Sequence, residues 1–230
     1  MATPRSSEGF VPLYDTLSAR YDRDASPRYF RHVLAWLAGQ LPVRGRVLDL
    51  GCGTGRYALA LAARGLDVVA MDESGEMIRR GRDKPDGHRV DFRVLEGSSA
   101  APEGQFDAVI LVDVWEFLAD PAKTLWHVRS VLRPGASAFI VTPHPAWRVP
   151  IIMAERLGIK RLAPAYGYRN GGRRVIEVAA LAGGLSVRTV TSLYGTLARA
   201  VVLEATPEEI PRIWRLSTRA EPADGPAFRG

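Results

Sequence analysis

The sequence predicts an α/β fold in which helices cover both faces of a largely parallel sheet. Short apolar runs alternate with helical patterns from residue 26 to residue 142. Such alternation is typical of βαβ units, whose crossover helices bury both faces of a parallel sheet. Two further strand-like runs near the end of the chain have no long crossover between them, which predicts an antiparallel pair at a sheet edge.

The first helix is predicted to begin after Ser26-Pro27, an N-cap followed by a proline at the first helical position, and to end at Pro42. Strands are then expected at residues 46–50, 67–71, 90–95, 106–112 and 136–142. The helices between them are expected at residues 57–64, at residues 74–82, and from Asp120-Pro121 along an apolar face that includes Leu132. A last helix at residues 174–181 stops at a glycine pair, and the final strands are expected at residues 185–191 and 196–204.

Composition indicates one ordinary globular domain. The chain has 230 residues, of which 47% are hydrophobic and 24% charged, and it has no run of about 18 apolar residues that could span a membrane. The first nine residues lack the apolar core of a secretory signal, and the single cysteine, Cys52, fits a reducing compartment, so a cytoplasmic protein is expected. The net charge is +6, but the basic residues are scattered, so no nucleic-acid partner is expected.

The sharpest signal is a strand that runs directly into a glycine-rich turn, from Val47 to Gly55. Glycines there permit positive φ angles and let a ligand approach the backbone closely. A dinucleotide-binding fingerprint would need its third glycine at position 56, where this chain has Arg56. Asp49 precedes the first glycine by two residues and would repel a pyrophosphate, so a ligand with a positive group fits better.

Asp72 follows the second strand at about the 20-residue distance that is usual for a carboxylate that accepts hydrogen bonds from a ribose. A ligand with both a ribose and a positive charge near Asp49 is S-adenosylmethionine, which carries an ammonium and a sulfonium. Each feature alone has a simpler explanation, since glycines occur in any tight turn and Asp72 could cap a helix. Their joint spacing favours the cofactor.

With these motifs the chain resembles class I S-adenosylmethionine-dependent methyltransferases from Tyr14 to Ala205, and its pattern is most similar to small-molecule O-methyltransferases of the ubiquinone-biosynthesis type. The matching motifs are Asp49-Leu-Gly-Cys-Gly-Thr-Gly55, Asp72 with Met77, Phe106-Asp107-Ala-Val and Leu132-Arg-Pro-Gly135. The resemblance implies a Rossmann-like doubly wound sheet of seven strands in the order 3-2-1-4-5-7-6, with strand 7 antiparallel. It also implies a helical cover at residues 1–45, a core at residues 46–205 with a lid insertion at residues 143–172, and a tail at residues 206–230.

The resemblance further implies which residues surround the cofactor. Relatives often carry Gly-Asp-Ala after the third strand, with the acid on the adenine, whereas this chain has Gly97-Ser98-Ser99, which leaves a hydroxyl without the charge. The expected cofactor contacts are Tyr14, Tyr21, Asp49, Gly51, Cys52, Gly53, Gly55, Asp72, Glu73, Met77, Ser98, Ser99, Val112 and Asp113.

Catalytic groups are expected at the C-terminal ends of the strands, where the crevice of such a sheet opens. His144, after the fifth strand, is the first choice as a general base, with an exposed loop histidine as the alternative. Asp113 and Glu116, after the fourth strand, are the next candidates. The segment around Glu116 resembles a Glu-His-Leu-x-Asp-Pro pattern near which some relatives can use a divalent metal. Phe117 replaces that histidine, and no metal is expected.

The insertion at residues 143–172 carries enough apolar and aromatic surface to contact an aromatic or lipophilic acceptor. Expected acceptor contacts are Trp115, Phe117, Trp147, Met153, Tyr166 and Tyr168. Apolar and charged faces do not separate cleanly in the insertion, so membrane-surface contact is only weakly indicated. The sequence therefore predicts a methyltransferase for a small molecule, acting on oxygen first and on nitrogen or carbon next. A non-catalytic cofactor-binding protein and an RNA methyltransferase are the alternatives, and the oligomeric state is left open.

Overall fold

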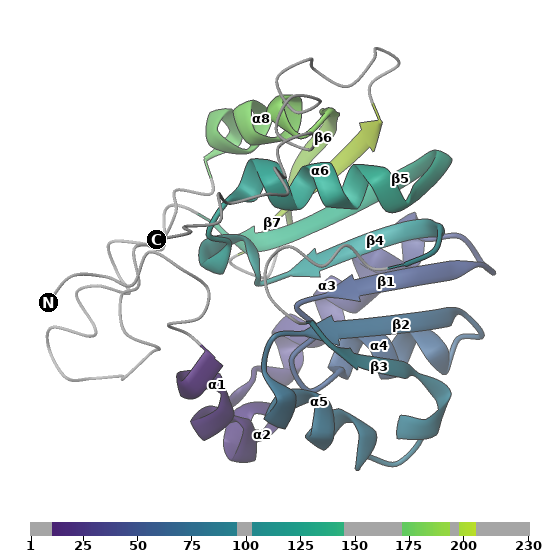
Figure 1. Cartoon of the computed structure of the whole chain (residues 1–230), viewed down its shortest axis with the longest axis vertical. Coiled ribbons are helices and arrows are strands. Elements are labelled where there is room, and N and C mark those ends of the chain that lie inside the picture. Colours follow the sequence, from purple (N-terminus) through teal and green to yellow (C-terminus); the bar gives the residue numbers. More distant parts are fainter. Residues whose placement is uncertain (1–10, 96–102, 145–171, 194–197, 206–230) are drawn as a thin grey trace, which may run out of the picture.

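The computed structural model describes residues 11–95, 103–144, 172–193 and 198–205 (Figure 1). These residues form a seven-stranded sheet in the order β3-β2-β1-β4-β5-β7-β6, which confirms the predicted order. The strands are β1 (Arg46–Leu50), β2 (Asp67–Asp72), β3 (Asp91–Val94), β4 (Phe106–Val112), β5 (Leu132–Pro143), β6 (Leu185–Leu193) and β7 (Ala198–Ala205).

Strand direction changes only at one side of the sheet. β1 pairs in parallel with both β2 and β4, and the parallel pairing continues from β2 to β3 and from β4 to β5. β7 is antiparallel to both of its neighbours, β5 and β6. The predicted antiparallel pair is confirmed, and the parallel strands all end at the same edge.

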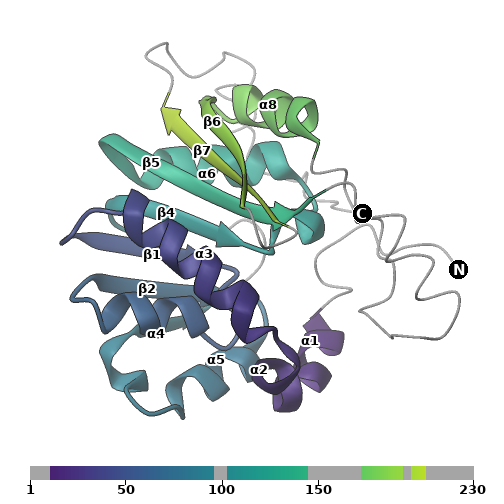
Figure 2. The same cartoon turned by 180° about the vertical axis from the view of Figure 1, so that it is seen from behind.

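Helices cover both faces of the sheet, as Figures 1 and 2 show from opposite sides. α3 (Pro27–Gln40), α4 (Arg56–Ala62) and α5 (Gly75–Arg82) bury apolar residues on one face, and α6 (Pro121–Val131) and α8 (Arg173–Ala182) do so on the other. Along β4, Ile110 packs into the first cluster and Leu111 into the second, because successive side chains of a strand point to opposite faces. Both faces of the sheet are buried under helices, which explains the near-continuous apolar runs of the strands.

Short helical elements precede α3 and connect the strands. They are α1 (Val11–Leu17), η2 (Ser18–Arg20), α2 (Tyr21–Asp24), η3 (Gly87–Arg89) and η4 (Trp115–Phe117). Within the described segments no helix combines the length and the apolar character needed to cross a membrane.

The predicted helix caps are present. Ser26 Oγ accepts a hydrogen bond from the Tyr29 N–H at 3.3 Å, and Asp120 Oδ1 accepts one from the Lys123 N–H at 3.0 Å. α8 ends at Ala182 with Gly183 as its C-cap, as the glycine pair predicts. Local sequence therefore fixes where these helices begin and end.

Several predicted boundaries are wrong by a few residues. The helical pattern places Leu132 on the apolar face of α6, yet Leu132 begins β5 and pairs with Phe106. The proline at position 134 disfavours helical geometry at Arg133, and the pairing buries Leu132. β5 thus starts before the expected Ala136, while α4 ends at Ala62 and β3 is limited to Asp91–Val94.

The glycine at position 55 gives a test of the fold. It has φ 75°, and a Cβ there would lie 2.4 Å from the Phe92 ring, so Gly55→Ala is expected to destabilise the protein by about 2–4 kcal/mol. Gly39→Ala is the matched control, because Gly39 lies in α3 with nothing within 4 Å of an added Cβ; it should be neutral or stabilise by up to about 1 kcal/mol. Urea unfolding measures both, and equal effects of the two substitutions would contradict the strained turn.

Candidate functional site

A cleft with two lobes lies at the C-terminal ends of β1, β2 and β4. Residues that line the Asp72 lobe include Val11, Tyr14, Gly53, Asp72, Glu73, Ser74, Met77, Val114, Phe117, Leu118, Ala119, Asp120, Lys123 and Thr124. Residues that line the Asp49 lobe include Ala25, Ser26, Arg28, Tyr29, Asp49, Cys52, Arg56 and Tyr57. Four residues line both lobes, which therefore meet at Tyr21, Gly51, Val112 and Asp113.

The glycine turn after β1 forms the floor between the lobes. Gly51 has φ 76°, and a Cβ there would lie 2.4 Å from the Val114 side chain, so only glycine fits this position. The Gly51 and Cys52 N–H groups both donate to the Met71 carbonyl of β2, at 2.7 and 3.0 Å. The turn is thereby fixed against β2 and presents bare backbone to a ligand.

Asp49, at the end of β1, is a buried carboxylate with one oxygen left without a partner. Its side chain accepts a hydrogen bond from the Ala58 backbone, whereas Oδ2 has no hydrogen-bond partner among the described residues. Burial, with a smaller contribution from the negative charge of Asp72, raises the pKa of Asp49 to about 7. A positively charged ligand group at Oδ2 would relieve both effects.

Asp72 ends β2 and faces the other lobe. Its Oδ2 accepts a hydrogen bond from the Gly53 N–H at 2.8 Å, and its Oδ1 accepts one from the Ser74 N–H at 2.9 Å. Burial raises the pKa of this carboxyl despite these two bonds. Since each carboxylate oxygen can accept more than one hydrogen bond, Asp72 keeps capacity for ligand hydroxyls.

Asp113 lies where the two lobes meet, directly after β4. Its φ of 56° is in the left-handed region, while its N–H donates to the Val141 carbonyl at 2.8 Å. The Tyr29 hydroxyl donates to Asp113 Oδ1 at 2.6 Å. Burial raises the pKa of Asp113 to about 6, and the hydrogen bond from Tyr29 opposes that rise.

Three residues predicted as catalytic groups or acceptor contacts line neither lobe. Trp115 was expected to contact the acceptor, but its side chain is fully buried in the apolar cluster beneath α6 and α8, because the sheet face offers this large ring an apolar environment. Glu116 is also buried, accepts a hydrogen bond from the Thr142 hydroxyl, and has its pKa raised by burial to about 7. His144, at the end of β5, has its Nε2 3.5 Å from the Arg199 guanidinium.

Most predicted cofactor contacts do gather at the cleft: every one within the described residues except Gly55 lines a lobe. Gly55 instead precedes the first residue of α4 as its N-cap. Outside the described residues lie Ser98, Ser99, Trp147, Met153, Tyr166 and Tyr168, together with most of the insertion at residues 143–172.

Sequence reasoning missed the side chains that α3 and α4 contribute to the Asp49 lobe, namely Arg28, Tyr29, Arg56 and Tyr57. The only signal was the predicted N-cap at Ser26, which puts Arg28 and Tyr29 in the first turn of α3. Arg28 and Arg56 bring two positive charges to this lobe, although the Arg56 guanidinium also lies over the Phe30 ring, 4.6 Å from its centroid, with Nε 3.9 Å from Asp22 Oδ1.

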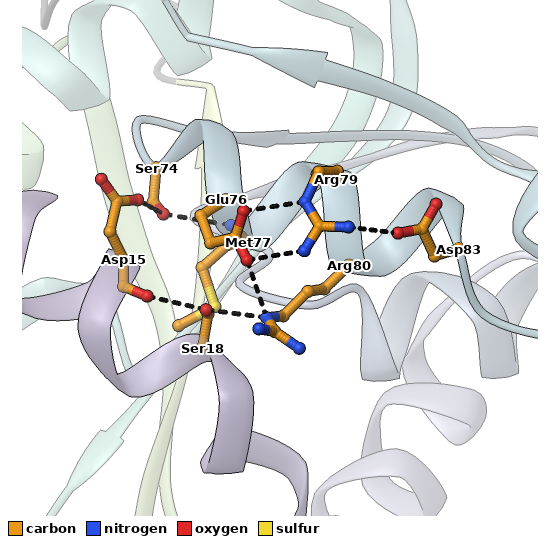
Figure 3. Close-up of polar contacts among 8 residues, drawn as sticks. All are labelled: Asp15, Ser18, Ser74, Glu76, Met77, Arg79, Arg80 and Asp83. Carbon is orange, nitrogen blue, oxygen red and sulfur yellow. Dashed lines mark hydrogen bonds and ion pairs between the residues drawn. The ribbon is translucent and has the colours of Figure 1, made fainter.

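Polar contacts hold α1 and η2 against α5 over the Asp72 lobe (Figure 3). The Ser74 hydroxyl donates to the Asp15 carboxylate, and Arg80 Nε donates to Ser18 Oγ at 2.8 Å. Ser74 Oγ also accepts the Met77 N–H at 3.1 Å, so the same hydroxyl caps α5. No residue of α1 is fully buried, so these polar contacts contribute much of what holds the cover formed by α1 and η2.

The adjoining helix α2 contacts the glycine turn. Asp22 accepts a hydrogen bond from Thr54 Oγ1 at 2.6 Å and forms an ion pair with Lys84 Nζ at 2.5 Å. The Tyr14 ring meets the Phe117 ring edge-on, with centroids 5.5 Å apart. Phe117, at the position of the relatives' histidine, therefore contributes an apolar wall, and no group of three or more His, Cys, Asp or Glu side chains suited to a metal occurs in the part of the chain that the structure describes.

Comparison with known proteins points to one family. A family model described as a methyltransferase domain matches residues 21–199. The ubiquinone biosynthesis O-methyltransferase of Xanthomonas axonopodis is 34% identical over 130 residues, which are 54% of this chain and 54% of that protein. The demethylmenaquinone methyltransferase of Thermus thermophilus is 30% identical over 162 residues, which are 68% of this chain and 73% of that protein. The chain thus spans about half the length of the first of these relatives.

A solved structure agrees with the fold. The complex between the Haloferax volcanii Trm112 methyltransferase activator and a methyltransferase matches with a TM-score of 0.68 and 20% identity, over 84% of this chain and 97% of the matched chain. At this identity the likeness shows the fold alone.

The carboxylate of Asp49, whose Oδ2 has no hydrogen-bond partner among the described residues, gives a stability prediction. Since its pKa rises from 3.8 to about 7 in the folded protein, the destabilisation is absent below about pH 4, grows as the pH rises, and is complete above about pH 7. Asp49→Asn should therefore stabilise the ligand-free protein at pH 8 by on the order of 2–4 kcal/mol, and by less at pH 5. Urea unfolding at both pH values checks this.

Asp67→Asn is the control, because the Asp67 side chain is 69% exposed and its ion pair with Arg46 Nε, at 3.4 Å, is a surface contact; its loss should change the free energy of unfolding by less than about 1 kcal/mol at either pH. An Asp49→Asn protein that is less stable than the parent at pH 8 would show that Asp49 has a compensating partner.

Proposed function

The chain belongs to the methyltransferase domain family, and we propose that it transfers a methyl group from S-adenosylmethionine to a small aromatic or lipophilic acceptor, with oxygen as the first choice of atom. The observation that carries the proposal is the cleft with two lobes. One lobe contains Arg28, Arg56 and Asp49, whose Oδ2 has no hydrogen-bond partner among the described residues. The other lobe is lined by Asp72, the acid expected to bind a ribose.

The residues present fit this cofactor. Asp49 Oδ2 would take the ammonium of the methionine part, and the Arg28 and Arg56 guanidinium groups of the same lobe would take its carboxylate. In the other lobe, Asp72 would accept the ribose hydroxyls and Met77 would pack on the adenine. The bare backbone at Gly51, between the lobes, leaves room for the link between the two parts.

The acceptor class rests on two observations. The insertion at residues 143–172 contributes Trp147, Met153, Tyr166 and Tyr168 to the sequence just after β5, and apolar and aromatic side chains are typical of such acceptor pockets. The relatives' names refer to ubiquinone biosynthesis and to demethylmenaquinone, which supports a quinone-like ring here. Phe117 adds an apolar ring to the cleft itself.

When bound, S-adenosylmethionine supplies a methyl carbon already activated by its positive sulfur. The protein must then orient the acceptor, exclude water and remove the hydroxyl proton. Asp113 borders both lobes and, with burial raising its pKa to about 6, is mostly ionised at pH 7–8. The Asp113 carboxylate would accept the proton of the acceptor hydroxyl, and the electron pair of that O–H bond would remain on the oxygen, which could then take the activated methyl group.

Cofactor binding should depend on pH through Asp49. Only the ionised carboxylate attracts an ammonium, so the Kd for S-adenosylmethionine should rise as the pH falls below about 7, approaching about tenfold per pH unit. Calorimetry from pH 5.5 to 8.5 measures this. In Asp49→Asn the Kd should be high and its pH dependence lost; a parent Kd that stays flat over this range would remove Asp49 from the binding site.

The base is tested by methyl transfer from methyl-labelled S-adenosylmethionine to catechol and to 1,4-naphthohydroquinone. Asp113→Asn should lower kcat by about 10²–10⁴-fold, the usual contribution of a positioned base. His144→Gln should stay within about threefold of the parent, because His144 lines neither lobe. Cofactor Kd values are measured alongside, to separate catalysis from binding.

The opposite pattern, a large loss in His144→Gln and little in Asp113→Asn, would make His144 the base. A protein that binds S-adenosylmethionine but labels neither probe nor any other small hydroxylated ring would favour the non-catalytic alternative.

A further inference from the structure

We infer that Tyr29 is a positioning residue: its hydroxyl fixes the Asp113 carboxylate toward the cleft and keeps it ionised at neutral pH, ready to take the acceptor proton. The inference rests on the proposed function, because it assigns how the base of that reaction is prepared.

The contact joins two distant parts of the chain. Tyr29 lies in the first turn of α3, and Asp113 follows β4, 84 residues later. The Tyr29 hydroxyl donates to Asp113 Oδ1 at 2.6 Å, a short distance typical of a hydrogen bond to a charged oxygen. No other described residue shows a side-chain hydrogen bond to this carboxylate, so its orientation within the fold depends on Tyr29.

The position of Tyr29 is itself fixed by the start of α3. The Tyr29 N–H donates to Oγ of the N-cap Ser26 at 3.3 Å, and its side chain packs against the apolar cluster that α3 and α4 share with the sheet. The hydroxyl is thus presented to the Asp49 lobe by a capped helix rather than by a loop.

The backbone of Asp113 is held in an unfavourable conformation. A φ of 56° costs a residue other than glycine about 1–2 kcal/mol, although Asp tolerates it better than most. The N–H remains bonded to Val141 on β5, so strand pairing fixes the backbone while Tyr29 fixes the side chain. A strained backbone conformation that the surrounding structure maintains is common at functional residues.

The groups around Asp113 show why the hydrogen bond from Tyr29 matters for the pKa of this carboxyl. Glu116, Tyr14, Tyr21 and Tyr57 interact electrostatically with the Asp113 carboxylate; Arg28 and Arg56 line the same lobe. Burial raises the pKa of Asp113, and among the described residues only the hydrogen bond from the Tyr29 hydroxyl lowers it. Burial also raises the pKa of Tyr29 far above neutral, so its hydroxyl stays a donor.

Removing this hydroxyl should move the titration of Asp113. A hydrogen bond to a charged group is worth about 1.5–3 kcal/mol, which corresponds to a rise of about one to two pH units in the Asp113 midpoint. In Tyr29→Phe the carboxyl would then be at least about half protonated at pH 7, and a protonated acid cannot serve as a base.

The experiment titrates Asp113 in ¹³C-aspartate-labelled protein by carboxyl NMR, with Asp113→Asn to assign the signal. The parent midpoint is expected near pH 6, and that of Tyr29→Phe about one to two units higher. Tyr57→Phe is the matched control, since Tyr57 lines the same lobe without a hydrogen bond to Asp113, and it should leave the midpoint in place.

The pH profile of kcat/KM with catechol is measured in the same proteins. Its acidic limb should move upward in Tyr29→Phe by the same amount as the NMR midpoint, with the rate recovering toward that of the parent near pH 9. An unmoved midpoint in Tyr29→Phe overturns the inference, and so does a moved midpoint with an unmoved limb. Parental methyl transfer by Asp113→Asn would instead overturn Asp113 as the base of the proposed function, a result read from a different variant.

Discussion

Parallel pairing of β1 with β2 and β4 brings three carboxylates, Asp49, Asp72 and Asp113, to one edge of the sheet. Each lies at or just past the end of its strand, and each is buried enough that its pKa is raised. Within the described residues none of the three acids forms an ion pair, and one oxygen of Asp49 has no hydrogen-bond partner. The edge is therefore electrostatically unfavourable as it stands, and a ligand that brings positive charge completes it.

The same edge explains why the cover is built from polar contacts. α1 and η2 lie on α5 through hydroxyl, carboxylate and guanidinium groups, and Asp22 reaches the glycine turn through Thr54 and Lys84. Although the Tyr14 ring contacts Phe117, no residue of α1 is fully buried, so α1 is among the less firmly packed elements. With the cofactor placed as proposed, beside Tyr14 and Tyr21, a cover of low intrinsic stability would let it enter and leave.

Features encoded locally could be predicted from the sequence. The strand order followed from a resemblance carried by short motifs, and the caps at Ser26 and Asp120 could be placed because each bonds a residue three positions later. Arg28 and Tyr29 could not be assigned to the cleft, since their place there depends on how α3 crosses the sheet. The position of the Trp115 ring could not be predicted either. The sequence pattern of its loop does not indicate that the ring packs inward, into the cluster beneath α6 and α8.

The unpaired oxygen of Asp49 also has a consequence for protein engineering. With the cofactor-binding role proposed for Asp49, this acid would weaken the ligand-free protein and yet be required for activity, so stability and activity would oppose each other at a single position. A library screened only for resistance to heating would enrich uncharged replacements of Asp49. The most heat-resistant variants would then be those that bind the cofactor most weakly. Screening with saturating ligand would reverse that preference, because the occupied carboxylate then contributes to folding.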